Sequence, residues 1–412
     1  MSQIYEIADL VISADLDPNN KVGFLGRRRG VPHIIELLKF PKVQSTPTRI
    51  CCTLSESPLD EQHAYFVGSQ RTGLTISSNG YDPVFDRAWC LQERFLATRL
   101  LHFMSTEMIW ECKTKIRCEC EYFELVEGLV EAFNTAMAKP GFHQCLLQSS
   151  ARAKVSRWWR MVEEYSLRGL TKETDRLPAI SGLARRMEDP GLGKYLSGIW
   201  RENLPWGLLW QCDRIGMNSG MSTPPGTTKK RGSRSKISVA PTWSWASITG
   251  PIRRPSRLLE KHILAAEILD IRCNPAGPDP YEKVTGGLLQ IKAPSVTARI
   301  SFCHGGWHEV SDNDGKAVQE QGWYELSSNG ERVSVSCHPD VSSIAPPLPT
   351  QDVLRVPIAR DQRKEAEEWA RALMVVPSQT SPALFERIGI TELELESGGL
   401  RSRMEMKTLT IV

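Results

Sequence analysis

The pattern of apolar and polar residues changes near residue 258 and divides the chain into two parts. Before this point, apolar residues mostly recur three and four positions apart, which is typical of amphipathic helices. After it, short apolar runs such as GGLLQIKAP, VTARISF and DVLRVPIA are separated by turn residues, which is typical of strands. We therefore predict an α+β protein with a partial α/β N-terminal part, a helical middle segment and a mostly-β C-terminal part.

Four regions follow from this pattern. They are 1–120, an α/β region; 121–212, a helical segment; 213–240, a flexible loop; and 241–412, a mostly-β region. The loop is predicted because Gly, Ser, Thr and Pro dominate it and it contains the basic run KKRGSRSK. One helix is expected inside the last region, near 361–373, where Ala366, Trp369, Ala370 and Leu373 share a helical stripe.

The first region contains a predicted helix and two strands that lie close together in the sequence. Asp82-Pro83 is typical of a helix start, and the helix is expected over 83–97. Strands are expected at RLLHF, 99–103, and EMIWEC, 107–112. Alternation places Met108, Trp110 and Cys112 on one face of the second strand, and Glu107, Ile109 and Glu111 on the other. Residues 4–11 have helical spacing, and LVIS can form a short strand after them.

Helical stripes continue through the middle of the chain. They are expected over 122–133, 155–165, 171–187 and 195–210. PTWSWAS, at 241–247, is predicted as a strand with Trp243 and Trp245 on the same side. Large aromatic residues at these spacings are more often core than ligand cage, so we expect the tryptophan-rich segments to pack in the interior.

Composition excludes several classes of protein. The chain is 41% hydrophobic, carries a formal net charge of +3 and contains twelve tryptophans, so it is not intrinsically disordered. It has no apolar run near the roughly 20 residues that a bilayer requires, so no membrane span is expected. The acidic start MSQIYEIADLVISADLD has no secretory signal pattern. We expect a cytoplasmic protein, with the nucleus as the alternative.

The eleven cysteines do not form a disulfide pattern, because their number is odd and their spacing irregular. Cys112, Cys118 and Cys120 form the one tight cluster, followed by His143 and Cys145. Zinc sites usually show two regular pairs, so we favour thiols in a reducing compartment over a metal site, and no metal is predicted.

Three basic clusters raise the question of nucleic-acid binding. They lie at 27–29, 229–236 and 253–257. Clustered Lys and Arg can neutralise phosphates. The middle cluster, however, has no interleaved aromatic residues and the net charge is only +3, so solvated loops are the preferred interpretation and nucleic acid is not an expected partner.

The segment DRAWCLQERFLATRLLHF followed by EMIWEC resembles the fungal heterokaryon-incompatibility (HET) domain. The residues that match are Arg87, Ala88, Trp89, Gln92, Glu93, Arg99, Trp110, Glu111 and Cys112. Downstream segments of the chain, among them SLRGLTKETDRLPAISGLA and PTWSWAS, are similar to those that follow this domain. They contribute Asp175, Arg176, Trp243 and Trp245 as structural motif residues. The resemblance covers most of 81–250.

The resemblance implies a function in non-self recognition and programmed cell death, exerted through assembly with other proteins or through self-association. It also implies a TIR-like α/β fold. The family's usual opening elements, Y-x-W-G and D-x-x-C-I-x-Q, are absent, so the chain is expected to lack the first half of this domain. An inert truncated paralogue and a misplaced start codon are alternatives. Such a truncation would expose a sheet edge, and residues 1–140 alone are expected to self-associate.

The TIR-like resemblance also implies a second function, hydrolytic cleavage of NAD as a substrate, with no resident cofactor. Glu93 is then the catalytic carboxylate, because a carboxylate near the ribose stabilises an oxocarbenium-like state. The binding residues are Trp89, Gln92, Trp110 and Glu111. In the structural alternative, Glu93 pairs with Arg87, Arg94 or Arg99, and Trp89 belongs to the core. A further hypothesis makes Cys112 a nucleophile beside His102, across a hairpin.

Overall fold

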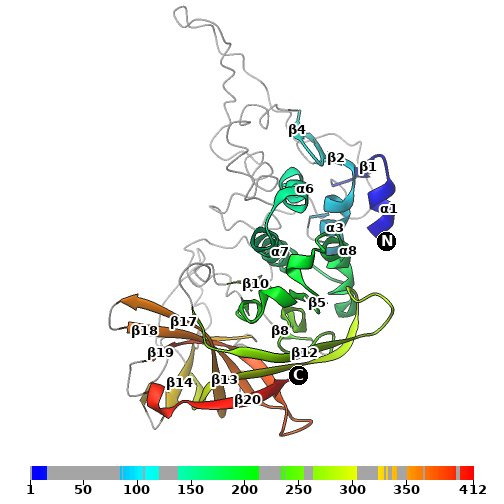
Figure 1. The fold of residues 1–412 in the computed structure, drawn as a ribbon. Coiled ribbons are helices and arrows are strands. Elements are labelled where there is room, and N and C mark those ends of the chain that lie inside the picture. Colours follow the sequence, from blue (N-terminus) through cyan, green and yellow to red (C-terminus); the bar gives the residue numbers. More distant parts are fainter. Residues whose placement is uncertain are drawn as a thin grey trace, which may run out of the picture. The chain divides into compact units, whose positions relative to one another are not determined.

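The structure, a computed structural model, describes residues 2–15, 84–85, 87–104, 107–119, 138–212, 233–235, 237–254, 263–303, 323–328, 331–332, 336–340, 350–364, 367–395 and 400–412. These residues form two compact units. The first contains the described residues up to Thr171 together with Ala179–Glu188. The second contains Lys172–Pro178 and the described residues from Asp189 onward. The predicted fold class is confirmed, since a mixed sheet with helices precedes a large mostly-β sheet (Figure 1).

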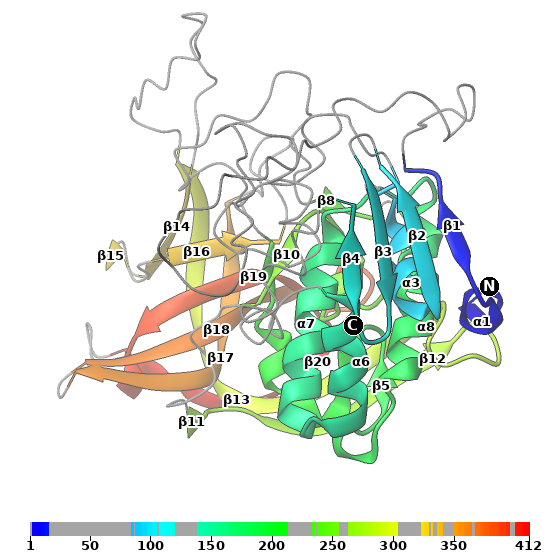
Figure 2. The same ribbon diagram turned by 90° about the horizontal axis from the view of Figure 1, so that it is seen from above.

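A four-stranded sheet forms one layer of the first unit (Figure 2). Its order is β1 (Val11–Ser13), β2 (Arg99–Phe103), β3 (Met108–Cys112) and β4 (Ile116–Cys118). β1 and β2 are parallel, whereas β2, β3 and β4 are antiparallel. Helix α3 (Ala88–Leu96) leads directly into β2. The predicted alternation of β3 is confirmed: Ile109 and Glu111 are completely buried, and Met108, Trp110 and Cys112 lie on the more exposed face.

Helices accompany this sheet in the described part of the first unit. They are α1 (Ser2–Ile7), α6 (Lys139–Gln148), α7 (Ala151–Ser166) and α8 (Pro178–Arg186). Ser150 caps α7 by accepting a hydrogen bond from the Ala153 amide, and α7 buries the expected stripe of Trp158, Val162 and Tyr165. α8 begins at Pro178, where a missing N–H costs nothing, so the helix predicted over 171–187 is shorter than expected.

The helix predicted over 195–210 is wrong, and with it the last part of the helical segment 121–212. β5 (Tyr195–Leu196) and β6 (Ile199–Trp200) form a hairpin, followed by the 3-10 turns Arg201–Asn203 and Trp206–Leu208. The hairpin turn has positive φ at Ser197 and Gly198, and Pro205 lacks a backbone donor. These local requirements override the helical spacing of the aromatic residues.

Trp200, Trp210, Trp243 and Trp245 belong to the core of the second unit, as predicted for these segments, but PTWSWAS is not a strand. Ser244 caps a 3-10 turn, Trp245–Ser247. The Trp245 indole N–H donates to the Gly198 carbonyl at 2.8 Å, and that of Trp210 donates to the Trp243 carbonyl at 3.0 Å. All three indoles are completely buried.

Gly198→Ala is expected to destabilise the second unit by about 1–3 kcal/mol. Gly198 has φ +97°, and a Cβ there would overlap the Trp245 ring. Urea denaturation, followed by peptide-resolved hydrogen exchange, measures the loss of unfolding free energy in the second unit. Gly277→Ala is the control, because a Cβ at Gly277 meets no atom within 4 Å. Equal stability of the two variants would contradict this account.

A ten-stranded sheet dominates the second unit (Figure 1). Its strands are β11 (Ile263–Leu264), β12 (Glu267–Pro275), β13 (Val284–Cys303), β14 (Trp323–Ser328), β15 (Glu331–Arg332), β16 (Ser336–Pro339), β17 (Gln351–Lys364), β18 (Glu367–Pro377), β19 (Phe385–Glu394) and β20 (Glu405–Ile411). The long β13 pairs with β20 over residues 289–295 and with β17 over 296–300. Since β17, β18, β19 and β20 also pair in series, these strands and β13 close into a ring.

The helix predicted near 361–373 is wrong. This segment is the end of β17 and most of β18, with Asp361 opposite Trp369. β18 is buried on both faces, since Leu373 and Met374 are both inaccessible. A strand of this kind has a continuous apolar run rather than an alternation, and its residues can match a helical stripe by coincidence.

Several predicted features lie outside the described residues. These are the stripe at 122–133, the basic run at 27–29 and most of the loop at 213–240. Within the predicted loop, β8 (Ser233–Arg234) pairs with β9 (Ile248–Thr249), so the end of that segment contains a strand. Within the part of the chain that the structure describes, no helix is long and apolar enough to cross a membrane.

Candidate functional site

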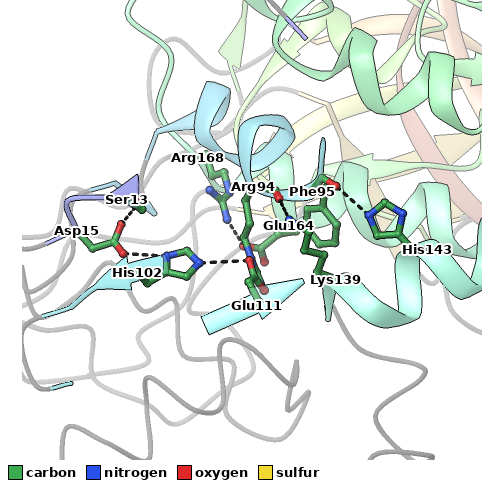
Figure 3. Close-up of polar contacts among 10 residues, drawn as sticks. All are labelled: Ser13, Asp15, Arg94, Phe95, His102, Glu111, Lys139, His143, Glu164 and Arg168. Atoms are coloured by element: carbon green, nitrogen blue, oxygen red, sulfur yellow. Dashed lines mark hydrogen bonds and ion pairs between the residues drawn. The ribbon is translucent and has the colours of Figure 1, made fainter. Parts of the chain in front are cut away.

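A line of buried and partly buried polar side chains runs through the first unit, from β1 to α3 (Figure 3). The Ser13 hydroxyl donates to Asp15 Oδ1 at 2.5 Å, and Asp15 Oδ2 lies 2.8 Å from His102 Nδ1. His102 Nε2 lies 3.2 Å from Glu111 Oε1. Arg94 binds Glu111 through two hydrogen bonds, from Nε at 2.7 Å and from Nη2 at 2.9 Å. We call these five residues the polar line.

The local structure explains how the polar line is assembled. His102 and Glu111 lie on neighbouring antiparallel strands, and the alternation of both strands turns them toward the same interior face. Arg94 is in the last turn of α3, and Asp15 follows β1. Asp15 and Glu111 are completely buried, His102 is 1% exposed and Arg94 is 4% exposed. Charges at this depth must be paired to be tolerated.

These contacts shift the pKa values of Glu111 and His102. Burial by itself raises the pKa of Glu111, but the charge of Arg94 and the hydrogen bonds from His102 and Arg94 bring the net pKa well below its ordinary 4.5. Burial by itself lowers the pKa of His102, but the carboxylates of Asp15 and Glu111 raise it, on balance, above its ordinary 6.5. The polar line is therefore an imidazolium and a guanidinium balanced by two carboxylates.

Two residues of α6 contact backbone carbonyls at the end of α3. Lys139 Nζ donates to the Arg94 carbonyl at 2.7 Å, and His143 Nε2 lies 3.2 Å from the Phe95 carbonyl (Figure 3). These carbonyls belong to the last turn of α3, where no intrahelical donor remains. Burial lowers the pKa of Lys139 to about 8, and burial together with the charge of Lys139 lowers that of His143 to about 4. His143 is thus neutral near neutral pH.

Glu93, the predicted catalytic carboxylate, is half-buried on α3. Its carboxylate lies by the Tyr5 hydroxyl and the Cys90 thiol, which both donate to it. Burial together with the Glu93 charge raises the pKa of each donor to about 12. Arg94 is bound to Glu111 instead, and Arg99 Nη1 donates to the Asp9 carbonyl at 3.2 Å. Of the three arginines proposed as partners of Glu93, two are therefore engaged elsewhere.

The four residues predicted to bind a ligand do not converge on one place. The Gln92 side chain is buried and accepts a hydrogen bond from the Gly182 amide at 3.0 Å, and Glu111 belongs to the polar line. Trp110 lies on the opposite face of β3 from Glu111. Trp89 is half-buried on α3. The side chains of Gln92 and Glu111 are thus engaged in hydrogen bonds inside the protein.

The hypothesis of a Cys112 nucleophile beside His102 is wrong. Successive residues of a strand point to opposite faces, so Cys112 points away from the face that holds Glu111 and His102. Its sulfur lies 3.4 Å from the Thr114 hydroxyl. The thiol therefore does not face His102, which is bound between two carboxylates.

The other motif residues have structural contacts. Arg87 forms a β-bridge with Gly169. Arg176, in the second unit, is buried and donates to the Thr249 hydroxyl at 2.9 Å. Asp175 closes the 3-10 turn Glu173–Asp175. Trp243 and Trp245 are core residues.

Sequence reasoning missed the roles of Asp15, Arg94 and Lys139. One signal was available: Glu111 shares the apolar-facing side of its strand with Ile109, and a carboxylate at such a position requires a buried cation. No local pattern identifies Asp15, which is 87 positions from His102.

Among the described residues, no three His, Cys, Asp or Glu side chains gather in a way that could hold a metal ion. Comparison of the chain with protein-family models gives no match, and comparisons with curated proteins and with solved structures give none either. Any assignment of function therefore depends on the sequence motifs and the contacts that their residues make.

Proposed function

We propose that this chain is a HET-like protein that acts in fungal non-self recognition and the cell death that follows it, by assembly with other protein chains in the cytoplasm, with the nucleus as the alternative. The observation that supports the proposal best is the packing of the motif segments of the first unit around α3. These segments carry the resemblance and are far apart in sequence.

Three contacts join those segments. Arg94 of the RAWCLQER segment binds Glu111 of IWEC. Gln92 of the same helix binds the backbone of α8, which carries LPAISGLA. The Ala88 amide donates to the Gly169 carbonyl at 2.9 Å, which joins α3 to the SLRGL segment after α7. A motif whose residues hold one another in place serves a scaffold, and this supports a role in assembly.

Exposed apolar side chains on α1 and β1 support self-association. Ile7 is 82% exposed, Ile4 65% and Ile12 54%. β1 pairs with β2 and is an edge strand within the described part of the sheet. The same edge on a second copy of this chain offers the same backbone groups and the same apolar residues. We therefore propose that a second copy of the chain binds along this edge.

Assembly is tested with two matched variants. Ile7→Lys together with Ile12→Lys is expected to reduce self-association, measured by analytical ultracentrifugation over a concentration series, and to relieve the growth arrest caused by inducible expression in a filamentous fungus. Leu147→Lys is the control, because Leu147 is an equally exposed helical residue of α6, at 83%. A monomeric wild-type chain that leaves growth unchanged would refute the proposal, as would the control behaving like the double variant.

The alternative function is NAD cleavage with Glu93 as the catalytic carboxylate. One observation favours it: Glu93 is only half-buried, and Arg94 and Arg99 are engaged with other groups. Nicotinamide release from NAD by purified protein tests it. NAD cleavage would be established if Glu93→Gln abolished the release of nicotinamide and the control variant Glu6→Gln left it intact. Glu6 is a half-buried carboxylate of α1. If purified protein released no nicotinamide at high concentration, the NAD-cleavage function would be refuted. If the chain also caused no growth arrest, the remaining interpretation would be an inert truncated paralogue.

A further inference from the structure

The short strand β1 is joined to the sheet by a short backbone pairing. Its pairing with β2 covers three residues, from Val11 opposite Leu100 to Ser13 opposite His102. Just beyond the strand, Asp15 is completely buried and reaches His102 across the sheet. Among the described residues, the contact between Asp15 and His102 is therefore the side-chain contact that joins this end of β1 to β2.

The geometry of His102 requires a proton on both ring nitrogens. Nδ1 faces Asp15 Oδ2 at 2.8 Å, and Nε2 faces Glu111 Oε1 at 3.2 Å (Figure 3). Carboxylate oxygens only accept hydrogen bonds, and a neutral imidazole carries one donor and one acceptor. A neutral His102 would point a lone pair at one of two buried carboxylates. Only the imidazolium satisfies both.

The charges around His102 make its two sides unequal. On the Glu111 side, Arg94 of α3 supplies two hydrogen bonds, and the positive charge of Lys139 of α6 is also close. On the Asp15 side, the structure gives the carboxylate the Ser13 hydroxyl and His102. The ring of Phe85, at 5.7 Å, adds no charge. If His102 loses its proton, Glu111 keeps a cation, whereas the described residues then give the buried Asp15 carboxylate none.

We propose that the protonated His102 is a latch that holds the Asp15 end of β1 against the sheet, and that loss of this proton at rising pH releases that end. The release opens the edge of β2, which is otherwise covered by β1. This inference is independent of the proposed function, because it concerns the attachment of a strand and not the partner that binds there.

The direction of the pH dependence follows from the pKa of His102, which is raised in the folded state above its ordinary 6.5. The stabilisation by the latch is fully present below pH 6.5 and is lost as pH rises through the folded-state pKa. Glu111 contributes in the opposite direction, at the acid end: its lowered pKa gives a stabilisation that is present above pH 4.5 and is lost as pH falls further. The anchoring of β1 is therefore strongest between these two values.

Hydrogen exchange of the full chain tests the latch. We expect the protection factors of the Val11–Ser13 amides, corrected for intrinsic exchange and measured from about pH 6 to pH 9, to fall by up to about tenfold per pH unit between pH 6.5 and the folded-state pKa of His102, and to level off above that pKa. Amides of β3 and β4 serve as the internal reference. His143→Gln is the matched control, because His143 is a buried imidazole that binds a carbonyl and should leave the effect intact. His102→Gln should remove the pH dependence.

Asp15→Asn provides a second variant, should His102→Gln not fold. It removes the carboxylate that deprotonation of His102 would leave without a cation, so the protection of β1 should depend much less on pH. It also removes one of the two carboxylates that raise the pKa of His102, so the His102 ring signals in NMR should titrate at a lower pH. Corrected protection of β1 that is constant over the pH range in the wild type would overturn the proposal. A pH dependence that persists in His102→Gln, or an NMR titration that finds His102 neutral at pH 6.5, would also overturn it.

Discussion

Glu111→Gln is expected to lower the free energy of unfolding of the first unit by about 3–5 kcal/mol, because it leaves two buried cations without their shared counter-charge. Glu111 is completely buried and binds Arg94 through two hydrogen bonds and His102 through a third. An amide keeps the shape but loses the charge. Urea denaturation with peptide-resolved hydrogen exchange separates the stability of the two units and measures the loss in the first.

The control for this prediction is Glu6→Gln in the same unit. Glu6 lies 3.8 Å from Arg186, and both side chains are 30% or more exposed, so its loss should cost about 0–1 kcal/mol. Replacing both partners, by Arg94→Met with Glu111→Leu, should recover part of the stability lost in the single variant, since no uncompensated guanidinium remains. A cost for Glu111→Gln no larger than that of the control would show that the polar line is not a stabilising element.

The second large effect is expected in the second unit, where Arg387→Met should also cost about 3–5 kcal/mol. Arg387 and Asp340 are both completely buried and bind each other through two hydrogen bonds of 2.9 Å. The same guanidinium donates to the carbonyls of Leu208 and Trp210 and stacks on the Trp210 ring, 3.3 Å from its centroid. Methionine would leave a carboxylate and two carbonyls buried without their donors.

Thermal and urea unfolding of the second unit measure this loss, with Asp352→Asn as the control. Asp352 lies 3.9 Å from Arg299, and both side chains are more than 60% exposed, so that variant should unfold almost like the wild type. Similar unfolding midpoints for Arg387→Met and Asp352→Asn would contradict the assigned role of Arg387.

Where the periodicity of the sequence reflects one buried face, the fold could be predicted. The stripe of α7 and the alternation of β3 both have one buried and one more exposed side, so the period is visible in the residues. The prediction failed where burial is not one-sided, as in β18, and where turn geometry dominates, as at Gly198. In both places the helical spacing of apolar residues had another cause.

The candidate site, like the fold, could be predicted only in part. The resemblance identified Glu93, Gln92 and Glu111 as residues of interest, and alternation placed Glu111 on the interior face of β3. Neither the resemblance nor the alternation could identify the groups that these side chains contact. Gln92 binds a backbone amide of α8, 90 positions away, and His102 binds a carboxylate 87 positions away in the opposite direction along the chain. Residues so distant meet only when the chain folds.

The sequence by itself therefore determined the class of fold, the faces of the one-sided elements and the residues that carry the HET resemblance, because these properties depend on neighbouring positions. The tertiary structure decided which charges pair: Arg94 with Glu111 rather than Glu93, and His102 with Asp15. The physical reason is that a buried charge selects its partner by proximity in three dimensions, where a low dielectric makes each pairing strong, and that proximity is not recorded in local sequence.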